Sequence, residues 1–203
     1  MEKKRIYKGE LGYIRTARVR KLWLTLLAFV IPVAAYVAAF LYWGTNKNII
    51  TVVAIVGCLP ACRSLVNLIM FFTIRSVPAK DAAKLKEHEG SLTCAYELYL
   101  TTYEKSVLLD ACAICGKTFI GLATFKNPDV KFLQKHIGNS LRAAGYSVNV
   151  NIMTDINKYL ERLDSMNANA DKLREGVTFK MDEKYPELSG EEIVKYKLMA
   201  VAL

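Results

Sequence analysis

Four residues near the middle of the chain are of types that bind metal ions. Cys112 and Cys115 form a Cys-x-x-Cys pair followed by glycine, a pattern typical of zinc knuckles. A structural zinc site takes four ligands, and Cys94 and His88 are the residues that could complete the set. Two features argue against such a site. The His-x5-Cys spacing is unusual, and residues three apart in an alternating strand face opposite sides. We therefore expect no metal ion or other cofactor.

A second informative residue is Arg63, a charge inside the apolar run of residues 49–73. It lies ten residues before the end of the run, or ~15 Å, which is about the middle of the hydrocarbon layer of a bilayer. A charge at that depth needs a partner. Pro32 and Pro60 each free the carbonyl four residues before them. Our hypothesis is that Arg63, helped by Asn67, donates to such carbonyls and so locks two helices or pairs protomers.

An alternative placement of the same run leaves Arg63 at the lipid headgroups. The helix would then span about residues 48–62, with the apolar residues that follow lying in the interface. This span is only ~22 Å long, so the bilayer would thin locally. Because a long arginine side chain can extend toward the headgroups, the sequence leaves both placements open.

Two apolar runs, residues 22–43 and 49–73, are the first elements that must position these side chains. The first run contains no charged residue and covers ~33 Å as a helix, and Trp23 and Trp43 suit the two interfaces. It is too long for the core of a signal peptide, and a second apolar run follows after a short polar turn. The sequence therefore predicts a two-helix transmembrane hairpin over residues 22–73.

The net charge of +9 is distributed unevenly along the chain. Residues 1–21 carry eight Lys or Arg and two acidic residues, whereas residues 74–203 carry 18 basic and 17 acidic residues. The positive-inside rule then places both termini in the cytoplasm. The basic flank of residues 1–21 suits anionic headgroups of the bilayer. The near-neutral soluble part lacks the basic patch that nucleic-acid binding needs, so we expect no nucleic-acid partner.

Residues 74–203 predict a cytosolic α+β domain with a four-stranded sheet and flanking helices. The periodicity changes from helical to alternating after Gly90, which predicts a three-stranded antiparallel meander. Asp155 and Ser189 each stand where a helix N-cap is expected. A further helix start is expected at Asn127, Pro128 and Asp129, as the cap, the first-turn proline and the first-turn acid. The predicted elements are a helix at 79–90, strands within 94–103, 106–115 and 118–125, a helix at 129–143, a strand at 146–153, and helices after Asp155 and Ser189.

This order of elements, over about residues 79–153, resembles the core of the PD-(D/E)xK nuclease-like superfamily. That superfamily places an aspartate on the second strand and an acid-x-lysine motif on the third. Asp110 lies on the second predicted strand, and Thr124 and Lys126 occupy the first and last places of the motif. The resemblance implies metal-assisted phosphodiester hydrolysis, but the second carboxylate is missing, which leaves a metal ion short of a ligand. A catalytically inactive scaffold is the other implication.

The whole chain resembles small two-span membrane proteins of clostridial Gram-positive bacteria. The stretches that carry the resemblance are YKGELGYIRTARVRK, GCLPACRSLVNLIMFF and CAYELYLTTYEKS. Some of these proteins bear an O-GlcNAc-transferase-like label. The 130 soluble residues of this chain are short for a nucleotide-sugar fold and contain no candidate diphosphate site. The resemblance therefore implies placement in the inner membrane of a bacterial cell.

The leading hypothesis is a multi-pass inner-membrane protein with both termini in the cytoplasm. Its α+β domain would bind or scaffold a protein partner, or a second copy of the chain. Two alternatives stay open: a membrane-tethered degenerate hydrolase that uses Asp110 and Lys126, and a zinc-stabilised regulatory domain.

Overall fold

The computed structural model describes residues 6–44, 49–101, 106–125, 128–179 and 185–202. It confirms the predicted α+β class, with two long apolar helices followed by a mixed four-stranded sheet and flanking helices. The chain forms two compact units. One is Ile14–Arg75, and the other joins Met1–Tyr13 to Ser76–Leu203. The residues before the first helix therefore group with the α+β domain, whereas the sequence suggested a separate basic flank of residues 1–21.

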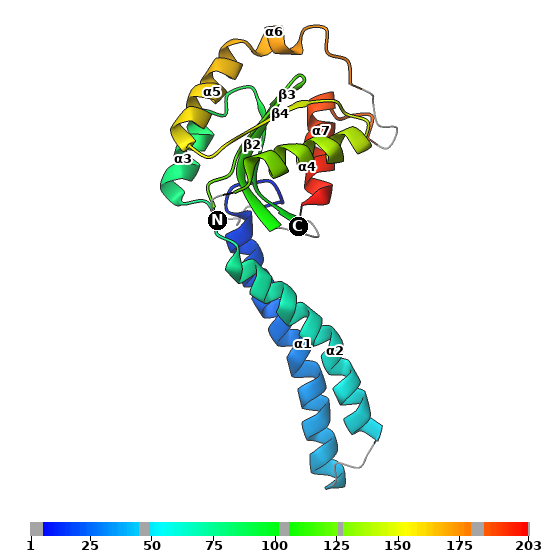
Figure 1. Cartoon of the computed structure of the whole chain (residues 1–203). Coiled ribbons are helices and arrows are strands. Elements are labelled where there is room, and N and C mark those ends of the chain that lie inside the picture. Colours follow the sequence, from blue (N-terminus) through cyan, green and yellow to red (C-terminus); the bar gives the residue numbers. More distant parts are fainter. Residues whose placement is uncertain (1–5, 45–48, 102–105, 126–127, 180–184, 203) are drawn as a thin grey trace. The chain divides into compact units, whose positions relative to one another are not determined.

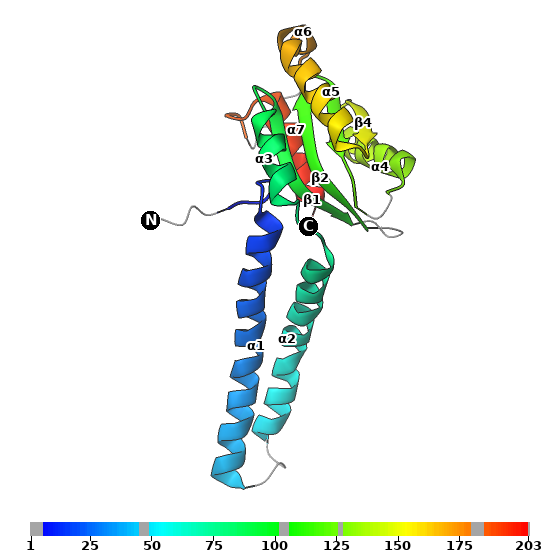
Figure 2. The same ribbon diagram turned by 90° about the vertical axis from the view of Figure 1, so that its left-hand side faces the viewer.

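The first unit is a helical hairpin. Helix α1 (Tyr13–Trp43) and helix α2 (Ile49–Thr73) lie side by side in Figures 1 and 2. Both are long and apolar enough to cross a membrane. Helix α1 begins nine residues before the predicted apolar run, so the basic residues from Arg15 to Lys21 continue the same helix. In each helix only 17% of the most apolar 18-residue stretch is buried, whereas the core helix of a soluble protein is mostly buried.

Four small residues and two large ones on α2 face α1, and we call this contact the seam. A methyl group added at Gly57 would lie 3.5 Å from Pro32, so the two backbones approach closely there. The hydroxyls of Thr25 and Ser64 bond across the seam at 3.0 Å. On α2 the seam residues recur at a heptad spacing, as in antiparallel helical pairs. They are Ala54, Gly57, Ala61, Ser64, Leu68 and Phe71.

The second unit is built around one sheet. The strands are β1 (Thr93–Thr101), β2 (Ser106–Cys115), β3 (Thr118–Leu122) and β4 (Asn149–Met153), in the spatial order β1-β2-β3-β4. The first three pair antiparallel, which confirms the predicted meander. Strand β4 pairs parallel to β3 because helix α4 (Val130–Ala143) carries the chain back across the sheet.

Helices cover both faces of the sheet, as Figure 1 shows. Helices α4 and α7 (Gly190–Val201) pack on one face, through a cluster that includes Leu133, Ile137 and Val194. Helices α3 (Ala79–Glu87), α5 (Ile156–Ala168) and α6 (Ala170–Arg174) pack on the other, through a cluster that includes Leu85, Tyr159 and Leu163. The predicted caps at Asp155 and Ser189 are confirmed: the side chain of Asp155 accepts from Asn157, and Ser189 forms a capping box with Glu192. In α4 the N-cap is Asp129, whose side chain accepts from Phe132, so the residue expected in the first turn is the cap itself. The expected cap, Asn127, lies outside the described residues.

Strand β1 departs from regular alternation at Glu97, which has a φ of +53°. Ala95 and Leu98 both belong to the cluster on the α4 and α7 face, although residues three apart in a regular strand face opposite sides. Strand β2 shifts in the same way, because Leu109 and Cys112 also share that cluster. The two strands shift together, so their pairing continues on both sides of the distortion.

Two glycines provide a test of how tightly the turn between β2 and β3 is packed. Gly116 and Gly145 both have positive φ, so alanine at either costs about 1–2 kcal/mol in backbone strain. A methyl group at Gly116 would also meet the backbone carbonyl of Leu173 at 2.0 Å, whereas the space around Gly145 is open. We expect Gly116→Ala to destabilise the chain by ~1–3 kcal/mol more than Gly145→Ala. Thermal unfolding of the full-length protein in detergent, followed by circular dichroism, measures both. Equal losses would contradict the packing described.

Candidate functional site

The carboxylate of Glu97 holds the segment that follows α2. The residue is 2% exposed, and its Oε1 accepts from the hydroxyl of Ser76 at 2.5 Å and from the amide of Val77 at 3.1 Å. Burying a carboxylate is costly unless hydrogen bonds stabilise it, and here they come from the start of the α+β unit. The residue with the strained backbone, Glu97, is thus the one whose side chain attaches the segment after α2 to β1.

The segment that precedes α1 attaches to the same strand. The amide of Tyr96 donates to the carbonyl of Gly9 at 2.9 Å, and Lys8 Nζ donates to the carbonyl of Ala202 at 2.6 Å. Gly9 has a φ of +88° and lies against Met199 and Ala95, so glycine fits both the conformation and the space. Two neighbouring residues of β1 therefore hold these segments: Tyr96 bonds the one before α1, and Glu97 bonds the one after α2.

Asp110 lies opposite Glu97, between the paired residues on either side. It is 6% exposed, and its Oδ2 accepts from both the amide and the hydroxyl of Thr124 at 2.7 Å. Thr124 stands where the nuclease resemblance expects a second acid. This neutral residue instead donates hydrogen bonds to the Asp110 carboxylate, the group that hydrolysis would need. In the structure these bonds from Thr124 to Asp110 hold the chain where it leaves β3. Lys126 lies outside the described residues.

The structure does not bring the four proposed zinc ligands together. Cys112 belongs to the cluster on the α4 and α7 face, whereas Cys94 and Cys115 belong to the cluster on the other face. His88 Nδ1 instead bonds Asp164 Oδ1 at 2.6 Å. Burial raises the pKa of Cys94 and of Cys112 to about 12, so both stay protonated thiols. Among the described residues, no group of three or more His, Cys, Asp or Glu is placed to hold a metal ion.

The four residues of the hypothesised intramembrane contact do not meet. Pro32 lies in the seam against Gly57, whereas Arg63, Asn67 and Pro60 are exposed and lie outside the seam. In the described part of the chain, neither Arg63 nor Asn67 makes a hydrogen bond or an ion pair. The seam is held by the bond between Thr25 and Ser64 and by the close approach of Gly57 to Pro32, contacts that the sequence did not indicate.

Glu191 is the centre of a bonded network at the start of α7. It is 8% exposed, and its two carboxylate oxygens accept from Arg174 Nε and Nη2, both at 3.0 Å. The amide of Gly116 at 2.7 Å and the hydroxyl of Thr93 at 3.1 Å add two further bonds. Burial by itself raises the pKa of Glu191, but these four bonds outweigh it and hold the pKa below the usual value.

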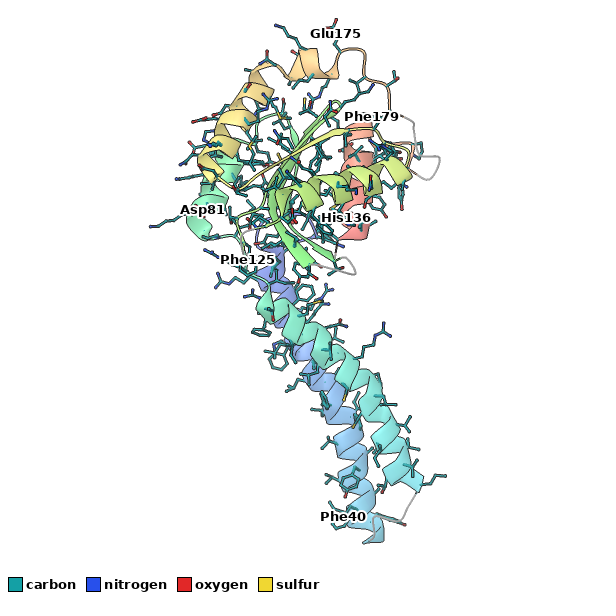
Figure 3. All side chains as sticks on the ribbon, viewed as in Figure 1. Phe40, Asp81, Phe125, His136, Glu175 and Phe179 are labelled. Atoms are coloured by element: carbon teal, nitrogen blue, oxygen red, sulfur yellow. The ribbon has the colours of Figure 1, made fainter. Side chains whose placement is uncertain are left out.

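This network forms one wall of a cleft of about 360 Å³, within the size range of ligand pockets. Val177 and Phe179 form an apolar part, and the ring of Phe179 packs so closely on α7 that a methyl group at Gly190 would lie 2.3 Å from it. Figure 3 labels Phe179 beside the start of α7. The lining residues are Thr93, Gly116, Arg174, Val177, Phe179, Ser189, Gly190, Glu191 and Glu192. The sequence indicated only the helix cap at this place, because α6 and α7 meet there through long-range contacts.

No family model, curated protein or solved structure matches this chain.

Loss of the Glu97 carboxylate should free the segment after α2. We expect Glu97→Ala to increase the rate of tryptic cleavage after Arg75 by about tenfold, because hydrogen bonds to a charged group contribute ~1.5–3 kcal/mol. Glu97→Gln, which keeps an acceptor oxygen, should fall between the wild type and Glu97→Ala. The fragments are identified by mass spectrometry of the full-length protein digested in detergent. An unchanged rate in Glu97→Ala would mean that the carboxylate does not hold this segment.

The network of Glu191 should make stability depend on pH. Because the folded state lowers the pKa of this carboxyl, its contribution is present above the usual value of 4.5 and is lost as the pH falls through the folded pKa. We expect Glu191→Gln to cost ~1.5–3 kcal/mol at pH 7, and the difference from the wild type to shrink below pH 4.5. Denaturant unfolding at several pH values measures this. Glu161→Gln, on the exposed side of α5, is the control and should change little. A difference that stays constant with pH would contradict the assignment.

Proposed function

We propose that this chain is a two-span inner-membrane protein whose cytoplasmic α+β domain binds a segment of a partner protein. The anchoring part is supported by α1 and α2, whose large apolar side chains are exposed along most of their length. Leu41 is 78% exposed and Ile49 is 79% exposed, values that suit contact with lipid rather than water.

The attachments on β1 support a hairpin with both ends on one side of the membrane. Gly9 precedes α1 and Ser76 follows α2, and both contact neighbouring residues of β1. These two contacts support a placement in which the segment before the first span and the domain after the second share a compartment. The basic residues of the N-terminal part favour the cytoplasm as that compartment. Arg15 and Arg20, exposed at the start of α1, suit contact with anionic headgroups.

The observation that carries the binding part of the proposal is the cleft between α6 and α7. Its lining combines an apolar part, Val177 and Phe179, with backbone and polar groups near Ser189. A protein segment that inserts an apolar side chain against Phe179 and bonds along the polar wall would use both parts. The Glu191 network holds α6, the start of β1 and the turn after β2 in place, so the cleft is formed before a partner arrives.

Photo-cross-linking in native membranes tests this proposal. A benzoylphenylalanine at Thr178, exposed between Val177 and Phe179, should give a discrete protein adduct on illumination. The same group at Glu161, exposed on α5, is the control and should give none. Phe179→Ala should reduce the adduct about fivefold, the effect of losing roughly 1 kcal/mol at an interface anchor. Circular dichroism checks that the variant still folds.

Two results would contradict the proposed function. One is the same adduct pattern from both positions, which would mean random collision. The other is Mg²⁺-dependent cleavage of a phosphodiester by the purified chain that is lost in Asp110→Ala, which would favour the hydrolase alternative.

A further inference from the structure

One face of α2 carries a charged residue among exposed apolar side chains. Arg63 and Asn67 lie one helical turn apart, and Val56, Leu59 and Val66 fall on the same face at spacings of three and four residues. We call these five residues the outer strip. Val56 is 57% exposed, and Leu59 and Val66 are each 66% exposed. The outer strip is distinct from the seam, whose residues are buried against α1 or hydrogen-bonded to it.

Arg18, in the same hairpin, is an arginine whose guanidinium has hydrogen-bond acceptors within the chain. Arg18 Nε donates to the carbonyl of Phe71 at 2.8 Å, and its Nη2 donates to the carbonyl of Ile74. Its guanidinium also lies 5.9 Å from the centre of the Phe72 ring. Arg18 thus caps the end of α2 near the interface. Arg63, ~15 Å deeper along the same helix, has no such partner in the described part of the chain.

Since the described part of the chain offers Arg63 no partner, a group of another molecule is the candidate, and its chemistry follows from charge. A guanidinium at mid-depth in hydrocarbon is strongly favoured next to a carboxylate, and its planar donors match one. Between Glu10 and Asp81 the sequence contains no acidic residue. A second copy of the chain would therefore bring another Arg63 and no counter-charge.

We propose that the outer strip docks a transmembrane helix of another membrane protein that carries Asp or Glu at mid-depth. Arg63 pairs with that carboxylate, Asn67 donates a further hydrogen bond one turn along, and Leu59 and Val66 pack beside them. The proposal rests on the membrane anchoring proposed above. It names the class of partner within the bilayer.

A synthetic polyleucine helix with one central Glu is the probe for this site. The full-length protein, with a fluorescent donor fused to its C-terminus, is reconstituted in phosphatidylcholine vesicles that contain acceptor-labelled peptide. We expect energy transfer to show binding about tenfold tighter to the Glu peptide than to an all-leucine peptide. Arg63→Leu should abolish this preference, and Arg63→Lys should retain part of it because the charge remains.

The matched control is Arg75→Leu, which removes an arginine beyond the end of α2 and should leave the preference unchanged. An equal preference for the Glu peptide in wild type and Arg63→Leu would overturn the proposal. Arg63-dependent energy transfer between two differently labelled copies, without peptide, would also overturn it and point to a second copy as the occupant. Carbonate extraction of the same membranes tests the anchoring separately. A chain released by carbonate would refute the membrane placement itself.

Discussion

The domain depends most on the buried carboxylate of Glu97. A non-glycine residue with positive φ is strained by about 1–2 kcal/mol. Moving a carboxylate from water into the protein interior without hydrogen bonds costs more free energy than that. The bonds from Ser76 and Val77 stabilise this arrangement. The distortion at Glu97 also decides which side chains of β1 and β2 face α4 and α7 beyond that point. One residue therefore connects the path of the chain, the register of the sheet and the composition of both core clusters.

Charged groups are used in two different ways in the two units. In the α+β unit, Glu97, Asp110 and Glu191 are buried and each accepts several hydrogen bonds from its own chain. They stabilise the fold because these hydrogen bonds offset the cost of burying a carboxylate. In the hairpin, Arg18 follows the same rule, whereas Arg63 does not within the described residues. This contrast, more than the presence of a charge in an apolar run, supports the docking surface proposed on α2.

Much of the fold could be predicted from the sequence because its signals are local. Alternating apolar runs located the meander, Asp155 and Ser189 located two helix starts, and the Asn-Pro-Asp stretch at 127–129 located a third, although its cap is Asp129. Interactions between distant residues could not be predicted. The attachment of Gly9 to Tyr96 and the bond between Glu97 and Ser76 join segments that no periodicity relates. The cleft depends in the same way on α6 meeting α7, and the outward position of Arg63 depends on which face of α2 packs on α1.

The bond between Gly9 and Tyr96 has a consequence for biosynthesis. The ribosome makes Lys8 and Gly9 first, but their partners Tyr96 and Ala202 emerge only after both apolar helices have been made. With the membrane placement proposed above, the N-terminal segment has to stay on the same side as the growing domain while the hairpin is inserted. In that placement, a first helix inserted the wrong way round would carry Gly9 across the bilayer and leave the amide of Tyr96 on β1 without its acceptor. Completion of the domain would thus discriminate against misinserted chains.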